Sequence, residues 1–250
     1  MKKICFLIGL SGLITVTAVQ AQMQITLTQN TQNNYGYGRG GEFNALANAS
    51  LLAINPTLSG YSAATADATS FETFCVETME DFNPGGTYNV DISQSIKFNN
   101  GQFSAPDGGA LTLGAAWLYS QFAAGTLQNY DYIDGGRQQS AGNLQNALWY
   151  LEGEISSPTD ALINSGADGT TFYNEALAAV GAANINNASD GAYGVVVLNM
   201  YAPNQDGSDG APAQDQLMVV PDYTIAVPEP TSLALASLGG LGLLLLRRKR

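Results

Sequence analysis

Residues 138–152 read QQSAGNLQNALWYLE, and this stretch decides the class of fold. Its apolar positions follow the i, i+3, i+4, i+7 spacing of an amphipathic helix, met by Leu144, Ala147, Leu148 and Leu151. This is the clearest periodicity in the chain. The stretch therefore predicts a helix that buries one face against the rest of the protein.

Strand patterns surround this helix on both sides. Helices are predicted at residues 111–124, with Leu111, Ala115, Leu118 and Phe122 on one side, and at residues 171–180. Strands are predicted at residues 23–28, 71–78, 87–98, 193–201 and 214–220. The turn signal at Asn83-Pro84-Gly85-Gly86 favours a hairpin between residues 71–78 and 87–98, and residues 35–41 read as a loop. A helical insertion between β segments predicts an α+β fold.

The first 21 residues have the pattern of a signal peptide. Lys2 and Lys3 precede an apolar stretch from Ile4 to about Ala18, and Val19-Gln20-Ala21 supplies the small residues that signal peptidase prefers. The apolar stretch is shorter than the roughly 20 residues that a membrane-spanning helix needs. We therefore expect cleavage after Ala21.

The other end has three parts in a fixed order. Val227-Pro228-Glu229-Pro230 is followed by an apolar run from about Leu233 to Leu246 and then by Arg247-Arg248-Lys249-Arg250. The run predicts a single membrane helix, and the positive-inside bias keeps the basic cluster in the cytoplasm. Residues 22–226 are then the exported α+β region, and residues 227–250 are a separate terminal signal.

This terminal arrangement resembles the PEP-CTERM sorting signal of Gram-negative bacteria that produce exopolysaccharide. The resemblance implies recognition of the Pro-Glu-Pro motif by exosortase, a membrane cysteine protease, and removal of the tail. It also implies an inner-membrane intermediate, held by the C-terminal helix, and a final place at the cell surface or in the extracellular biofilm matrix. The alternative is a plain C-terminal anchor that no protease cuts.

Composition excludes several classes of function. Residues 22–226 carry three basic side chains, Arg39, Lys97 and Arg137, against twenty acidic ones, a formal net charge of −17. Such a surface repels nucleic acid and anionic lipid. The chain contains no histidine, so the Ser-His-Asp and Cys-His sites and the usual zinc sites are not available. We expect no enzymatic activity, no metal and no cofactor, and nothing obliges the polar turn at residues 204–210 to bind calcium.

Two short segments carry the candidate chemistry. Phe74-Cys75-Val76-Glu77 contains the single cysteine of the exported region, and Leu144-Gln145-Asn146-Ala147-Leu148-Trp149 lies on the predicted helix. Together they resemble the TQXA-type thioester domains of bacterial surface adhesins, over about residues 71–154, although Leu144 stands where that family often has threonine. The resemblance implies that Cys75 and Gln145 condense into an internal thioester, which then reacts with an amine on a partner molecule.

The same residues also allow purely structural interpretations. Cys75 is then a buried core thiol and Gln145 a surface amide, in a structural or carbohydrate-associated matrix protein that forms no reactive bond. Glu77 is a candidate base for the thioester. Glu152 and Glu154 diverge at i and i+2, which predicts a solvated helix end rather than a glycosidase pair. Lys97 is a candidate for an isopeptide bond with an asparagine, and nothing near it in sequence singles out a partner.

Overall fold

The computed structural model describes residues 22–28, 35–54, 69–97, 109–133, 135–160 and 165–220. The predicted signal peptide and sorting signal lie outside these residues. The strands are β1 (Gln24–Thr28), β2 (Gly36–Tyr37), β3 (Gly40–Gly41), β4 (Phe43–Ala47), β5 (Ser70–Thr73), β6 (Thr87–Ser93), β7 (Val195–Pro203) and β8 (Asp209–Val219). The helices are α1 (Ala49–Ile54), α2 (Leu113–Ala123), α3 (Arg137–Leu151), α4 (Thr170–Val180) and the short 3₁₀ turn η1 (Ala192–Gly194).

Six strands form one antiparallel sheet in the order β5-β4-β1-β6-β7-β8. Strand β5 lies at one end of this order and β8 at the other. Strands β2 and β3 pair separately as a very short hairpin. The sheet is built mainly from consecutive strands, and α2, α3 and α4 are inserted between β6 and β7.

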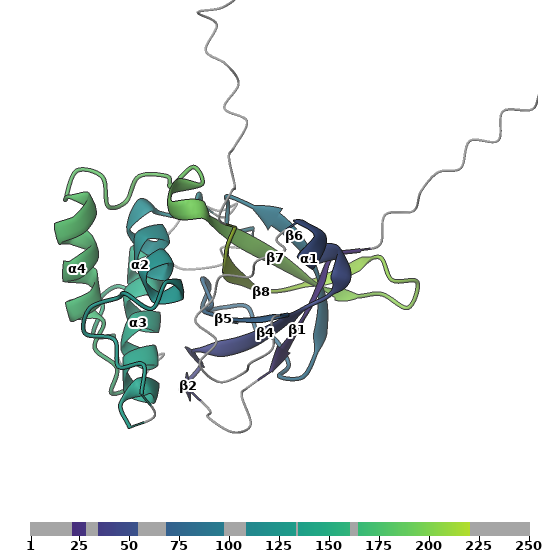
Figure 1. The fold of residues 1–250 in the computed structure, drawn as a ribbon, viewed down its shortest axis with the longest axis horizontal. Coiled ribbons are helices and arrows are strands. Elements are labelled where there is room, and N and C mark those ends of the chain that lie inside the picture. The colour runs from purple at the N-terminus through teal and green to yellow at the C-terminus, as the bar shows by residue number, and fades with distance from the viewer. Residues whose placement is uncertain are drawn as a thin grey trace, which may run out of the picture.

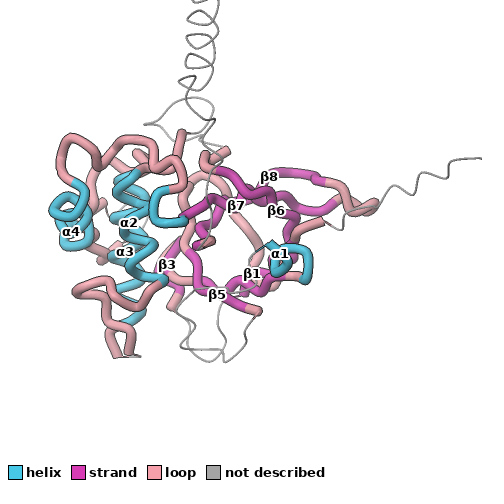
Figure 2. The backbone as a smooth tube through the Cα atoms, turned by 45° about the horizontal axis from the view of Figure 1, so that its top comes forward, coloured by secondary structure: helices cyan, strands magenta, loops and turns pink. Residues whose placement is uncertain are grey.

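The sheet curls until its two ends meet. Directly after β5, Cys75 forms a β-bridge with Gln216 of β8. Beside it, Val76 N–H donates to the carbonyl of Asp215 and Leu217 N–H donates to the carbonyl of Phe74. We call this contact between residues 73–76 and residues 215–217 the seam. Figure 2 shows the strands arranged around a ring, with α2, α3 and α4 to one side. The seam removes much of the exposed edge that an open sheet would leave.

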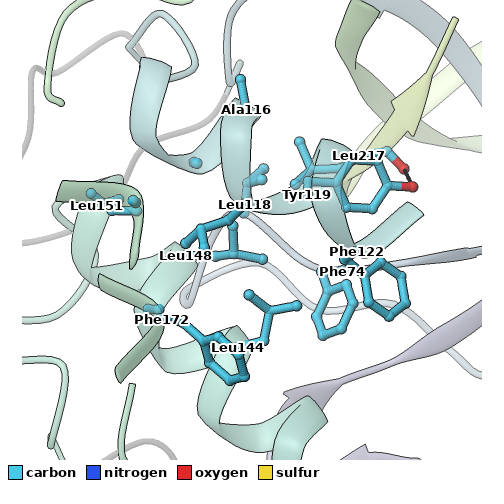
Figure 3. Packing of buried hydrophobic residues seen from close by; sticks show 14 of the residues in the cluster. Phe74, Ala116, Leu118, Tyr119, Phe122, Leu144, Leu148, Leu151, Phe172 and Leu217 are labelled. Atoms are coloured by element: carbon cyan, nitrogen blue, oxygen red, sulfur yellow. Dashed lines mark hydrogen bonds between the residues drawn. The ribbon is translucent and has the colours of Figure 1, made fainter. Parts of the chain in front are cut away.

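Two apolar clusters fill the molecule. One lies between α2, α3, α4 and the sheet, and Figure 3 shows Leu118, Phe122, Leu144, Leu148 and Phe172 packed within it. The other fills the curled sheet. Trp149 of α3 and Cys75 belong to this second cluster, so α3 contributes to both. Figure 1 shows the three helices as one layer beside the sheet. Helix α3 therefore connects the helical layer to the interior of the sheet.

The main elements of the sequence prediction are confirmed. Helices α2, α3 and α4 match the predicted segments within two residues at each end, and β1, β7 and β8 overlap the predicted strands. All four periodic residues of α3, namely Leu144, Ala147, Leu148 and Leu151, are buried. A helical insertion between β segments, and with it an α+β architecture, is therefore present in the described residues.

Three details of the prediction are wrong. Residues 71–78 and 87–98 do not form a hairpin, because β5 pairs with β4 whereas β6 pairs with β1 and β7. Residues 35–41 are not only loop, since β2 and β3 lie within them. Glu152 and Glu154 are not a solvated helix end, because both side chains are buried.

The buried carboxylates of Glu152 and Glu154 anchor two different segments. Glu152 accepts hydrogen bonds from the amide and hydroxyl of Thr112, just before α2. Glu154 accepts the same pair of bonds from Thr78, near the seam. Burial raises the pKa of both groups, that of Glu152 to about 7. Each carboxylate therefore anchors its own loop.

A buried polar cluster joins the sheet to the start of α3. The guanidinium of Arg137 binds both carboxylate oxygens of Glu42, and Tyr130 donates its hydroxyl proton to the same carboxylate at 2.6 Å. Arg137 also lies 4.4 Å from the ring centroid of Tyr35. Glu72 lies nearby, and burial together with the charge of Glu42 raises its pKa to about 8.

Replacement of Arg137 by alanine should be strongly destabilising, because it leaves the carboxylate of Glu42 buried without its cation. Removal of one partner from a buried ion pair costs about 3–5 kcal/mol. Arg39→Ala is the matched control, since Arg39 pairs with Asp81 at the surface and exposed pairs contribute only about 0–1 kcal/mol. Urea unfolding of both variants measures the difference, and equal losses would show that the buried pair contributes little.

Stability should also decrease as the pH rises through the pKa of Glu72. A folded pKa of about 8 exceeds the ordinary value of 4.5, so the folded state binds more protons between these two values. The contribution of Glu72 is complete below about pH 4.5 and is lost on the way to about pH 8. Glu72→Gln should flatten the fall in unfolding free energy between pH 5 and pH 8, measured by urea titration. An unchanged slope would exclude Glu72 as its source.

Candidate functional site

Cys75 lies at the seam, where β5 ends and the chain meets β8. Its side chain is fully buried, and burial raises the pKa of the thiol to about 12. The sulfur is not free of contacts, because Nε2 of Gln216 lies 3.3 Å from Sγ and donates to it. The structure thus places a protonated thiol in a dry position against a side-chain amide.

Gln216 is the residue that the sequence prediction missed. Its side chain is fully buried on β8, and Nε2 donates to the carbonyl of Gln214 as well as to the sulfur. Oε1 has no hydrogen-bond partner among the described residues. A buried acceptor without a partner costs about 1–3 kcal/mol. In the sequence, Gln216 follows Gln214 and Asp215 and directly precedes the apolar run Leu217 to Val220, so no local signal pointed to it.

The side chain of Gln145 forms hydrogen bonds with the backbone of Cys75. Its Oε1 accepts hydrogen bonds from the amides of Cys75 and Gly41, each at 3.2 Å, and its Nε2 donates to the carbonyl of Cys75 at 2.7 Å. The interpretation of Gln145 as a surface amide is therefore wrong, since the side chain is fully buried. The structure brings Cys75 and Gln145 together, through the main chain of the cysteine.

The β2–β3 hairpin lies on α3 directly over Gln145. A Cβ atom at Gly40 would lie 2.6 Å from Cγ of Gln145 and 2.8 Å from the ring of Trp149. A Cβ atom at Gly142 would likewise lie 2.5 Å from the ring of Tyr37. Glycine at these two positions allows the hairpin and the helix to approach closely, which excludes water from the amide of Gln145.

Glu77, the candidate base, forms hydrogen bonds with residues at the seam and beside it. Its carboxylate accepts a hydrogen bond from the amide of Asp215 at 2.9 Å, and its carbonyl accepts bonds from the side chains of Trp149 and Gln214. The side chain is buried, so solvent does not reach it freely. Glu77 holds the segment after Cys75 in place.

The described residues contain no group of three or more histidine, cysteine, aspartate or glutamate side chains placed to hold a metal ion. Within the same residues, no helix has the length and apolar character needed to cross a membrane. Residues Val227 to Pro230 and Arg247 to Arg250 lie outside the described part of the chain.

Chemically, the site combines a thiol with two glutamine amides. The amide of Gln216 touches the sulfur, and that of Gln145 binds the main chain on either side of it. All three side chains are fully buried. An amide carbonyl reacts with a thiol only when the two are held in contact and away from water. The amide nitrogen of Gln216 is in contact with the sulfur, and burial keeps water away from both groups.

Comparison with known proteins identifies the terminal signal. Residues 226–250 match the PEP-CTERM protein-sorting motif. The chain is therefore an exported protein that passes through a membrane-anchored intermediate and is processed by exosortase. No curated protein and no solved structure matches the chain.

Replacement of Gly40 by alanine should displace Gln145, because the added methyl group overlaps both its side chain and Trp149. Overpacking of this kind costs about 1–3 kcal/mol. Thermal unfolding followed by circular dichroism should show a lower melting temperature. Gly109→Ala is the matched control, because a Cβ atom there meets no atom within 4 Å. Equal melting temperatures for the two variants would contradict the close packing of the hairpin on α3.

Proposed function

We propose that this exosortase-processed protein is a covalent adhesin that uses an internal thioester at Cys75. The observation that supports the proposal is the contact of 3.3 Å between Sγ of Cys75 and the amide nitrogen of Gln216, in a position closed to water. The thioester then reacts with an amine on a partner molecule and leaves a stable amide. The proposal accounts for a single cysteine in residues 22–226, since cysteines of exported proteins are usually paired.

The contacts favour Gln216 over Gln145 as the acyl partner. The amide of Gln216 lies against the sulfur and its carbonyl oxygen has no partner, so the group is free to change its geometry. All three hydrogen bonds of Gln145 go to backbone groups. One observation favours Gln145 instead. Its Oε1 accepts bonds from two backbone amides, which would stabilise the oxyanion formed when a thiol attacks its Cδ. We assign the acyl role to Gln216 and keep Gln145 as the competing candidate.

Formation of the thioester requires no oxidant and no cofactor. The sulfur attacks Cδ of the glutamine, the bond from Cδ to Nε2 breaks, and the nitrogen leaves as ammonia with the proton of the thiol. Burial keeps that proton on the sulfur in the unreacted protein, because the pKa of the thiol is raised to about 12. The hydrogen bond from Nε2 partly offsets this by favouring the thiolate.

Reaction with a partner reverses the role of the sulfur. The nitrogen of an amine attacks Cδ, an amide forms, and the sulfur leaves as the thiolate and recovers a proton from the attacking nitrogen. A net charge of −17 over residues 22–226 disfavours nucleic acid and other polyanions as partners. The second candidate function is a structural or carbohydrate-associated matrix protein without a reactive bond, supported by the core packing of Cys75.

Mass spectrometry of the full-length chain in detergent, before and after treatment with methylamine, tests the proposal. Measured against the mass expected from its sequence, the wild-type chain should lack one ammonia more than Cys75→Ala does, and methylamine should add its own mass at the thioester. Cys75→Ala should keep its mass unchanged on treatment with methylamine. Fragmentation should locate the methylamide on Gln216. Gln216→Ala should abolish the modification, whereas Gln145→Ala should leave the methylamide position unchanged.

Two outcomes overturn parts of this proposal. A methylamide on Gln145 would move the acyl role to that residue and leave the covalent function standing. A free thiol at Cys75 and no mass change with methylamine, in a chain that is folded by circular dichroism, would exclude the thioester and favour the non-covalent matrix protein.

A further inference from the structure

A lysine, an asparagine and an aspartate meet beside β7. Oδ2 of Asp215 accepts hydrogen bonds from the backbone amide of Lys97, at 2.9 Å, and from Nδ2 of Asn199, at 2.6 Å. Oδ1 of the same carboxylate accepts the amide of Met200 at 3.0 Å. Asn199 and Asp215 are buried, and burial raises the pKa of Asp215 to about 6. One buried carboxyl group thus lies against both the side chain of the asparagine and the main chain of the lysine.

The side chain of Lys97 turns toward the same strand. Its Nζ lies 4.4 Å from the centroid of the Tyr201 ring. Tyr201 follows Asn199 by two positions on β7, and residues two apart on a strand point to the same face. The ammonium group is therefore held on the face of β7 that also carries the amide of Asn199.

A β-bulge places the aspartate in this position. Leu198 pairs with Gln216 and Met200 pairs with Ala213, so Asn199 faces two residues of β8, Gln214 and Asp215. The extra residue bends the strand and redirects side chains. Asp215 consequently points at Asn199 rather than continuing the regular ladder.

We propose that Lys97 and Asn199 condense into an intramolecular isopeptide bond, with Asp215 transferring the proton. This proposal is independent of the thioester. The amine form of Nζ attacks Cγ of Asn199, the bond from Cγ to Nδ2 breaks, and Nδ2 leaves as ammonia. Asp215 gives a proton to the leaving nitrogen and recovers one from the attacking nitrogen. Nothing is oxidised or reduced, and no co-reactant is needed.

The geometry suits the departure of ammonia from Asn199. Nδ2, the leaving nitrogen, already bonds the oxygen that would protonate it, at 2.6 Å. A buried carboxyl group with a raised pKa carries its proton closer to neutral pH than an exposed one. Lys97 is also the only lysine between residues 22 and 226, so the bond removes the one side-chain amine of that region that could react with a thioester in the same chain.

Trypsin digestion of the full-length Cys75→Ala chain tests the proposal without interference from a thioester. An acylated lysine is not cut, so residues 40–137 should remain one fragment and should be joined to the fragment that begins at residue 138. The joined species should lack the mass of one ammonia. Methylamine should not release it, because an amide, unlike a thioester, resists the amine.

Three variants identify the reacting groups. Lys97→Arg keeps the charge at an exposed position, should fold normally, and should lose the joined species entirely. Asp215→Asn should reduce the joined fraction at least tenfold. Asn89→Ala is the matched control: Asn89 is a buried asparagine bonded to a different aspartate, Asp209, and its loss should leave the joined species in place.

Two results would contradict the isopeptide between Lys97 and Asn199. Complete cleavage after Lys97 in the Cys75→Ala chain, with the full mass for both fragments, would overturn the isopeptide. A joined species that persists in Lys97→Arg would assign the bond to other residues. Neither result bears on the thioester, which is measured by the methylamine reaction of the chain that retains Cys75.

Discussion

Closure of the sheet at the seam is the constraint on which the rest of the structure depends. Residues 75 and 216 are far apart in the chain, and only the curl of the whole sheet brings them into a β-bridge. The hydroxyl of Tyr119, on α2, lies 2.9 Å from the carbonyl oxygens of both Glu72 and Leu217, one on each side of the seam. Thr73 adds a hydroxyl that bonds the backbone of Leu217 in both directions. The helical layer therefore supports the closure, and the closure creates the contact between Cys75 and Gln216.

Side chains replace strand pairing where the seam is too short to continue. After Cys75 the chain leaves the ladder, and its backbone groups need other partners. Gln145, Gln214 and Trp149 supply them by bonding the main chain of Cys75 and Glu77. Most polar groups at the seam are satisfied in this way, as burial requires. Oε1 of Gln216, beside the sulfur, has no hydrogen-bond partner among the described residues.

Local pattern was enough to predict the helices and not enough to predict the closure. The period of residues 138–152 is a property of neighbouring residues, so α3 and its buried face could be derived from sequence. The turn predicted at residues 83–86 is present, but a turn does not determine which strands pair. In the sheet, β4 and β1 lie between β5 and β6. The proximity of Cys75 and Gln145 followed from a family resemblance. Gln216 was missed because its importance arises only from long-range pairing, and the burial of Glu152 was missed because Thr112 reaches it from another segment.

The bulge in β8 explains how two candidate condensation sites can lie next to each other without interfering. Successive residues of a strand point to opposite faces, so Asp215 and Gln216 already diverge. The extra residue opposite Asn199 turns the carboxylate of Asp215 toward Lys97 and Asn199, while Gln216 stays in register with Leu198 and faces Cys75. The two sites share only the backbone of Asp215. Its amide donates a hydrogen bond to the carboxylate of Glu77, and its carbonyl accepts one from the amide of Val76. Strand β8 thus directs Gln216 toward Cys75 and Asp215 toward Asn199, and the direction in which it presents these side chains disfavours the alternative pairing of Lys97 with Gln216.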